Sequence, residues 1–545
     1  MLQNNDVRTS LLNPTTRLDF IGGPSGRKFY RADKNNFAPN LGFAWDPFGT
    51  GRTSVRGGYM ISFPNDNLIA TVQTTLGANA GLRSFTTLPN QTATLADRPI
   101  IPTPPYKVPR TFADNYALSP RSSAGIAMPG LVTPYVQQWN VSVEREVAGV
   151  LISARYIGNK GSDLLRMVDY NQVIYDADGF LADFKRAQAN GAAAEAATGH
   201  YNPSFNADIP GSQPLTVFPR LAAGGQLTNF NVINLIRTGQ VGELASTYQI
   251  SGGNGDVNFF PNPDLVNAVV ATNGGSSHYN GLQLEATRRV RDGLQMQFSY
   301  TYGKSMANNR GTSAANLEPL LDNANPQVEY ARTPFDIRHA FKANYYYELP
   351  YGPGKPWSGN RVLNHLLGNW ALSGIWTYTS GSPFSILSGY GTVNTQQISF
   401  LTNTASIEGT TLSNLKPLTS GVYRTGDKLY FVSPALLNTD GRATSQAGAP
   451  DFAGQAFYNP GAGQLGNLPR RAFSGPWNFG WDMSAIKTLQ FGERHRLELH
   501  FDFFNVFNHP TFNLGVSNIN QPTFGQLTSM RTIPRQIQIG AYYRF

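Results

Sequence analysis

The sequence LQMQFSYTY, residues 294–302, alternates between apolar and polar side chains without a break. Such alternation is typical of a β-strand with two unlike faces, because successive side chains of a strand point to opposite sides of the sheet. The apolar face would carry Leu294, Met296, Phe298, Tyr300 and Tyr302. The other face would carry Gln295, Gln297, Ser299 and Thr301. One side of this strand therefore requires an apolar medium, and the other requires water or polar groups.

The preceding segment, YNGLQLEATRRV at 279–290, alternates in the same way. The turn Arg291-Asp292-Gly293 is expected to join the two segments into a hairpin. Further predicted pairs are 37–45 with 52–63, 135–147 with 150–158, 336–349 with 370–380, and 479–489 with 496–507. With the C-terminal segment 533–545, this pattern predicts eleven strands. A weaker twelfth strand falls at Thr15 to Gly22.

The composition favours one large β architecture over the roughly three soluble domains that 545 residues could form. Only 14% of residues are charged and 12% are aromatic, while 55 glycines and 36 prolines supply many turns, so helices should be scarce. The net charge of +9 comes from lysines and arginines scattered singly, which argues against a nucleic-acid partner. The absence of cysteine excludes disulfides, thiol catalysis and cysteine-bound metals.

No run of 18 apolar residues is present, so the sequence encodes no transmembrane helix. The first residues, MLQNNDVRTSLL, show neither a basic segment nor an apolar core, and no signal peptide is predicted. This start is expected either for a cytosolic protein or for a chain whose beginning is missing.

The length of the strands and of the connections distinguishes a membrane barrel from a soluble sandwich or propeller. The strands are about ten residues long and end in aromatic residues, as expected for strands that cross a bilayer at a tilt. Short turns alternate with long polar connections at 64–134, 159–277, 304–335, 381–478 and 508–532. Outer-membrane barrels combine short periplasmic turns with long extracellular loops in this way. A propeller would need regular repeats, and a sandwich core would favour Val, Ile and Leu over Tyr and Trp.

In such a barrel, the apolar residues of the segment 294–302 are expected to face lipid: Leu294, Met296, Phe298, Tyr300 and Tyr302. The glutamines and the serine between them are expected to face the lumen. If the short turns are periplasmic, the last strand descends and Phe545 lies at the periplasmic rim.

The chain offers little support for enzymatic or cofactor chemistry, and we predict no catalytic residue, no cofactor and no metal site. GAGQLG at 461–466 matches a dinucleotide fingerprint, but neither a strand precedes it nor a helix follows it. The stretch YGKS at 302–305 lacks the first glycine of a phosphate loop. His495 and His500 are the only histidines close together, and their spacing is not that of a zinc site.

One segment, FLADFKRAQANGAAAEAA at 180–197, predicts a helix inside the longest loop. Phe180, Phe184 and Ala187 would share its apolar face. The helix would stiffen the loop, with direct ligand contact as the alternative. The preceding DADG, Asp176 to Gly179, is interpreted as a polar turn, since the glutamate expected later in a calcium loop is missing; a surface calcium site is the alternative.

Several segments in order resemble the C-terminal barrel of Oar-like TonB-dependent receptors. They are NNFAPNLGFAWDPFGTGRTSVRGGY (35–59), YVQQWNVSVEREV (135–147) with YIGNKG (156–161), DIRHAFKANYYYELPYG (336–352), GNWALSGIWTYTSGSPF (368–384), and FDFFNVFNHPTFN (501–513) with IPRQIQIGAYYRF (533–545). The resemblance covers Asn35 to Phe545 through the strands, and the long loops match poorly.

The resemblance implies an all-β, antiparallel transmembrane barrel in the bacterial outer membrane. Barrels of this superfamily have about 22 strands around a plugged lumen, and they draw energy from the inner-membrane TonB complex to import a bulky or scarce solute. This chain departs from the pattern because it supplies only half of the strands and shows no plug, TonB box or signal peptide. It is therefore expected to be the C-terminal half of a larger barrel: 1–36 as a loop with a partial strand, and 37–545 as the barrel domain.

The C-terminal sequence QIGAYYRF is similar to the assembly signal of outer-membrane proteins. Gln538, Gly540, Tyr543 and Phe545 occupy its four positions, and the resemblance implies recognition by the barrel-assembly machinery. A strand that stays unpaired until the barrel closes can be read by strand pairing. The alternative is that these aromatics belong only to the interfacial girdle. For the whole chain, a passive porin-like channel and a surface adhesin remain the alternatives to energised uptake.

Overall fold

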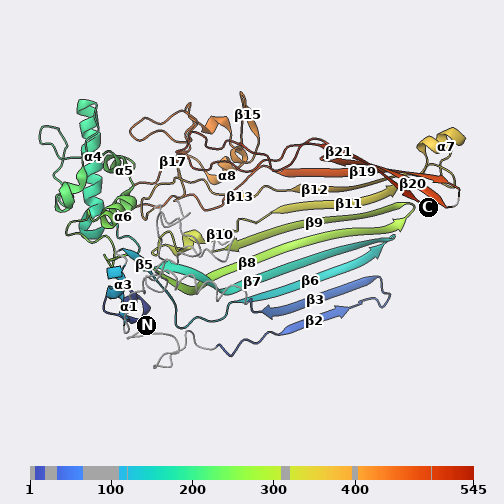
Figure 1. Ribbon diagram of the computed structural model, residues 1–545, viewed down its shortest axis with the longest axis horizontal. Coiled ribbons are helices and arrows are strands. Elements are labelled where there is room, and N and C mark those ends of the chain that lie inside the picture. The colour runs from blue at the N-terminus through green and yellow to red at the C-terminus, as the bar shows by residue number, and fades with distance from the viewer. Residues whose placement is uncertain are drawn as a thin grey trace, which may run out of the picture.

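The computed structural model describes residues 6–18, 33–64, 110–118, 121–308, 319–395, 403–492 and 494–545. Its main feature is a twisted antiparallel sheet of long strands, with short turns at one end and long loops at the other (Figure 1). Eleven strands form the continuous path of this sheet, which we call the strand wall. In order they are β2 (Asn40–Trp45), β3 (Thr53–Ser62), β6 (Tyr135–Val147), β7 (Val150–Asp169), β8 (Leu265–Arg291), β9 (Leu294–Ala307), β11 (His339–Glu348), β12 (Trp370–Thr379), β19 (Asn478–Phe491), β20 (His495–Phe504) and β21 (Gln536–Arg544).

The predicted hairpins are confirmed, and their turns use backbone conformations that suit a tight reversal. Asp292 and Gly293 between β8 and β9 have φ of 53° and 76°, and Ala148 and Gly149 between β6 and β7 have φ of 52° and 80°. Positive φ at both central residues matches the twist of the flanking strands. Residues 294–302, with their unbroken alternation, lie in β9, which pairs with β8 on one side and β11 on the other.

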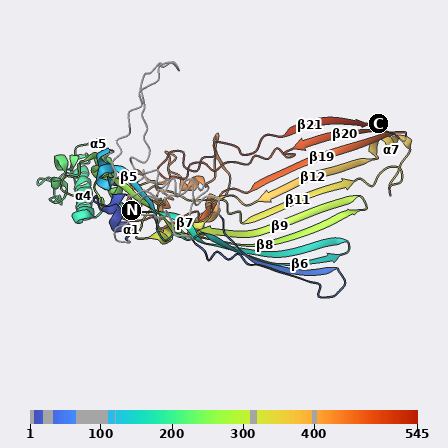
Figure 2. The same cartoon turned by 60° about the horizontal axis from the view of Figure 1, so that its bottom comes forward.

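The strand wall is open in the part of the chain that the structure describes. Its order begins at β2 and ends at β21, and each of these two strands has one partner, β3 and β20 respectively (Figure 2). The predicted twelfth strand does not join the wall. Its described residues Arg17–Leu18 form β1, which pairs with β4 (Arg110–Thr111), while 19–22 lie outside the described residues.

Strand length was predicted wrongly for β7 and β8, which contain 20 and 27 residues. Both continue beyond the hairpin core into the segment that was expected to be loop, with irregular register after Gly161. Two short strands also join the sheet at this end: β5 (Ser122–Ala127) runs parallel to β8, and β10 (Ala331–Arg332) pairs with β9.

The longest predicted loop is a folded unit, which we call the helical lobe (residues 170–264). The predicted helix is confirmed as α4 (Phe180–Thr198), and its Phe180, Phe184 and Ala187 are completely buried. Two further helices, α5 (Phe230–Arg237) and α6 (Val241–Ser251), complete the core with Phe218 and Phe259. These two helices were not predicted, because α5 has only eight residues and α6 buries residues on several sides, so neither shows a long helical period of apolar residues.

The predicted loops 381–478 and 508–532 also fold together instead of staying separate. Phe431, Phe457 and Phe524 are completely buried in a shared core. Small elements support it: β13 (Pro383–Phe384) with β18 (Phe473–Ser474), β14 (Ser406–Ile407) with β17 (Phe457–Tyr458), β15 (Tyr423–Thr425) with β16 (Lys428–Tyr430), and α8 (Leu412–Leu415). Aromatic residues far apart in sequence form this core, so local patterns did not reveal it.

The start of the chain packs at the loop end of the wall. Helices α1 (Val7–Leu12) and α3 (Phe112–Leu118) form a small core with the beginning of β8. At the opposite end, α7 (Arg361–Leu367) lies beside the short turns and the C-terminus (Figure 1). No helix among the described residues is long and apolar enough to span a membrane.

Candidate functional site: the polar face of the strand wall

The register of the wall brings polar side chains from distant strands into continuous rows. One row runs through Gln295, Tyr346, Ser373, Ser484 and Asp502 on five neighbouring strands. Since side chains two residues apart share a face, the neighbouring row of Gln297, Asn344, Ile375 and Asp482 lies on the same side. We call this side the polar face.

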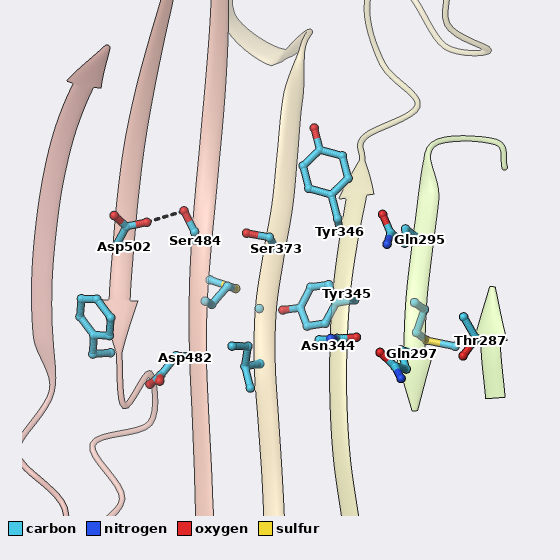
Figure 3. A pocket seen from close by; sticks show the side chains of 15 residues that line it. Thr287, Gln295, Gln297, Asn344, Tyr345, Tyr346, Ser373, Asp482, Ser484 and Asp502 are labelled. Carbon is cyan, nitrogen blue, oxygen red and sulfur yellow. Dashed lines mark hydrogen bonds between the residues drawn. The ribbon is translucent and has the colours of Figure 1, made fainter. Parts of the chain in front are cut away.

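A shallow cavity of about 420 Å³ opens where these two rows cross β9, β11, β12, β19 and β20 (Figure 3). Ser484 donates a hydrogen bond to the Asp502 carboxylate, and Asp482 accepts from the backbone N–H of Asn505 at 2.8 Å. The side chains of Gln295 and Gln297 extend from β9 at the other side of the cavity (Figure 3). The cavity therefore offers carboxylates, amides and hydroxyls as hydrogen-bonding groups.

Charged pairs extend the polar face across the earlier strands. Glu144 on β6 lies 3.7 Å from Arg56 on β3 and 3.8 Å from Arg155 on β7. Glu285 on β8 accepts a hydrogen bond of 2.6 Å from the side chain of Gln297 on β9. Polar and charged side chains thus occur on this face from β3 to β20.

Nearer the loop end, the polar face holds a larger cavity of about 700 Å³ that includes Ser299, Thr301 and Lys342. Its wall is fixed by Asp336, which is almost completely buried and accepts hydrogen bonds from Arg332 at 2.7 Å and from the backbone N–H of Ser305 at 2.7 Å. This arrangement holds the segment before β11 against β9.

The opposite side of the wall, which we call the outward face, carries aromatic residues. Tyr300, Phe341, Tyr378 and Phe479 form one register row across β9, β11, β12 and β19. The rings of Tyr300 and Phe341 lie 4.4 Å apart between centroids, and Tyr378 stacks on Trp477 at 4.7 Å. The alternation predicted from 294–302 is therefore continued sideways by the neighbouring strands.

By the alternation and register of β9, the residues predicted to face lipid share the outward face, but Met296 also lines the 420 Å³ cavity. Met296 and Tyr302 expose 38% and 44% of their surface, and Tyr300 bonds to His339 Nδ1 at 2.9 Å. Among the residues that the structure describes, those around the 420 Å³ cavity include no histidine, cysteine or lysine.

The four residues of the predicted assembly signal divide between the two faces of β21. Gln538 and Gly540 pair with Asp502 and His500 on the polar face. Tyr543 lies on the outward face, stacks on Phe545 at 5.9 Å and bonds to His495 Nδ1 at 2.7 Å. The two aromatic members are therefore together, and the two small or polar members are apart from them.

The motifs GAGQLG and DADG, interpreted above as loop and turn segments, both lie among the described residues. Gly463 of GAGQLG has φ of 75° and lies beside Leu181 of the helical lobe. This segment therefore packs against the helical lobe. Asp178 of DADG forms an ion pair of 2.7 Å with Arg220.

Sequence reasoning did not identify Asp482 and Asp502 as cavity residues. They come from β19 and β20, far from β9 in sequence, and only the strand register brings them together. Asp482 directly follows Trp481 and Asp502 directly follows Phe501 in alternating segments, so the alternation could have assigned both carboxylates to the polar face.

The outer membrane beta barrel domain family matches residues 2–538 of the chain. No curated protein matches it. Among solved structures, the outer-membrane transporter YddB of Escherichia coli shares 9% identity, with a TM-score of 0.37 over 92% of this chain and 40% of its own. The iron transporter FrpB of Neisseria meningitidis shares 11%, with a TM-score of 0.34 over 93% of this chain and 39% of its own. The ferripyoverdine receptor of Pseudomonas aeruginosa shares 9%, with a TM-score of 0.33 over 94% and 33%. The chain thus spans less than half the length of each of these proteins.

Proposed function

Because the chain belongs to the outer membrane beta barrel domain family and is located in the bacterial outer membrane, we propose that it forms part of the wall of a TonB-dependent receptor. The receptor would import a bulky or scarce solute with energy from the inner membrane. The observation that carries this proposal is the division of one continuous sheet into a hydrogen-bonding face and an aromatic face. Lipid satisfies the aromatic face, and a water-filled or plugged lumen satisfies the polar face.

The two free edges support a barrel larger than the described wall. Strands β2 and β21 each have an unpaired side among the described residues. Unpaired backbone N–H and C=O groups cost several kcal/mol each in hydrocarbon, so only closed barrels or helices span a bilayer. Further strands would cover both edges and complete a barrel of about 22 strands, the number that the resemblance implies. A plug domain would provide the contact with TonB.

The same edge gives the assembly machinery a strand to pair with. We propose that Gln538, Gly540, Tyr543 and Phe545 act as the assembly signal, since β21 presents its free backbone side together with two aromatic rings. The girdle alternative would use Tyr543 and Phe545 only as interfacial anchors.

A surface adhesin is the second candidate, and the helical lobe favours it. A folded lobe with its own core at the loop end offers a stable surface for a partner. Energised uptake and adhesion differ in their need for inner-membrane energy.

Conductance and solute entry test the proposal together. The full chain, purified and placed in planar bilayers, is expected to give no stable unit conductance, because its edges cannot close a native pore. A steady conductance that falls when Asn344→Cys is modified by a charged thiol reagent would instead establish a passive channel. The matched control is Ala343→Cys on the outward face of the same strand, where the reagent should leave any current unchanged.

In cells that express the whole receptor of which the chain is proposed to be a part, entry of labelled solutes too large for general porins is compared with and without a protonophore. Energised uptake predicts that the receptor-dependent part of the entry disappears when the inner membrane is de-energised. Cell binding to a surface partner that survives the protonophore, without any entry, would support the adhesin.

A further inference from the structure

Helix α7, on the connection between β11 and β12, exposes an apolar side that the fold leaves uncovered. Val362 and Leu366 have 65% and 63% of their surface exposed, and Leu367 and Leu363 have 51% and 42%. At 100° per residue these four side chains share one side of the helix, while Arg361 and His365 lie on the other. The helix is a defined element, because the side chain of Asn360 caps it by accepting from the Leu363 N–H at 2.9 Å.

The C-terminal end of α7 is fastened to the outward face of the wall. Trp370 on β12 donates its indole N–H to the Leu366 carbonyl at 2.9 Å. Lys487 on β19 donates to the Leu366 carbonyl at 3.3 Å and also to the Gly368 carbonyl. Trp370 and Lys487 are register partners, and both lie on the outward face by the alternation of their strands.

The hydrogen bonds to α7 account for the burial of Lys487, which would otherwise cost free energy. Lys487 is only 6% exposed although it stands on the apolar side of the sheet. A buried ammonium needs hydrogen-bond acceptors, and the last carbonyls of a helix are unsatisfied acceptors at the negative end of its dipole. The Lys487 ammonium also lies 5.6 Å from the centre of the Trp370 ring, a cation–π distance. Lysine and helix therefore satisfy each other and fix α7 beside the wall.

We propose that α7 is an interfacial anchor whose apolar side inserts into the headgroup and acyl boundary of the phospholipid leaflet at the short-turn end. Its place next to the short turns and the C-terminus puts it at one rim of the wall (Figure 1), and Trp370 and Lys487 hold its last turn against the outward face. Amphipathic helices bind membranes by burying such a side about 5–10 Å into this boundary. The inference rests on the proposed lipid contact of the outward face.

The test uses the absence of cysteine in the chain, so that each introduced cysteine carries the only label. An NBD fluorophore is placed on Leu366→Cys in the full chain, reconstituted in phosphatidylethanolamine and phosphatidylglycerol vesicles that contain 5-doxyl lipid. His365→Cys, on the polar side of the same helix, is the matched control. The Leu366 label is expected to emit at shorter wavelength and to be quenched at least about twofold more than the His365 label, given that depth of insertion.

Two labels on β21 separate the anchor from the wall. Ile539→Cys on the outward face reports lipid contact of the sheet, and Gln538→Cys reports the polar face. Quenching at Ile539 with equal, aqueous signals at Leu366 and His365 would overturn the anchor and leave the wall intact. Loss of quenching at both Ile539 and Leu366 would overturn both. A Leu366 signal that depends on the protein-to-lipid ratio, without nitroxide quenching, would show contact with a second copy and would also overturn the anchor.

Discussion

In the helical lobe, the rings of Phe180 and Phe184 are completely buried, whereas on β21 the side chains of Ile539 and Tyr543 remain 70% and 56% exposed. The lobe gathers its aromatic residues inside, as a soluble domain does. The wall puts them outside and keeps glutamine, serine and aspartate on its other face. The different placement of the same residue types indicates two different surroundings. Water is expected around the lobe, and hydrocarbon is expected at the outward face of the wall.

The largest effect is expected in the lobe core. Phe180 packs on Phe259 and Phe218 with ring centroids 4.9 and 5.2 Å away. Phe180→Ala should lower the free energy of unfolding of the lobe by about 3–5 kcal/mol, because it removes the ring and leaves a cavity. Hydrogen exchange should rise in α4, α5 and α6 and stay unchanged in the strand wall. Phe230, which is 81% exposed, is the control, and its change to alanine should cost little.

On the wall, a charged residue should be costly on the outward face and tolerated on the polar face. Phe298→Arg would put a charge on the outward face, and near the bilayer midplane this should cost about 2–4 kcal/mol of folding free energy in lipid. Gln297→Arg, one residue away on the polar face, should be mild. Equal losses for both variants in a refolding titration in lipid vesicles would show that the two faces do not see different media.

The sequence predicted the wall well and the loop regions poorly, for a physical reason. Alternation is a local property, so 294–302 was sufficient to identify β9 and to divide Gln297 from Phe298. The cavity could not be predicted from local alternation, because Asp482 and Asp502 line it together with Gln295 only through the register of the intervening strands. The core of Phe431, Phe457 and Phe524 joins segments with no local period, and α7 is too short for its amphipathic pattern to stand out.

A smaller effect with a pH signature is expected at Asp183 of α4. Burial alone would raise the pKa of this carboxyl, but the backbone N–H groups of Phe218, Thr216 and Val217, at 2.9, 2.8 and 2.7 Å, and Arg186 lower its pKa below the ordinary value. A lowered pKa in the folded state adds stability above the unfolded pKa of about 3.9, and this stability is lost as the pH falls through the folded pKa.

The variant Asp183→Asn should therefore destabilise the lobe by about 1–3 kcal/mol at neutral pH, as expected when buried donors lose a good acceptor. Its stability should also vary less between neutral pH and pH 3 than that of the unchanged protein. Thermal unfolding of the lobe at several pH values measures both. A variant whose pH dependence parallels that of the parent would contradict the role of the carboxylate.

The smallest effect on stability, and the most specific one for function, is expected from deletion of Phe545. Its side chain is 92% exposed and it follows the last paired residue, Arg544. Removing it should change the stability of inserted protein by no more than about 0.5 kcal/mol, as for surface changes that break no buried contact. If the assembly machinery reads this ring together with Tyr543, the amount of chain that reaches the outer membrane should fall clearly, while the heat resistance of the inserted fraction stays normal. Phe545→Trp keeps an aromatic ring and should restore insertion, whereas Phe545→Ser should not. Normal insertion of the truncated chain would leave Phe545 as an aromatic of the membrane interface alone, and the outward faces of β21 and of β9 would then serve the same single purpose.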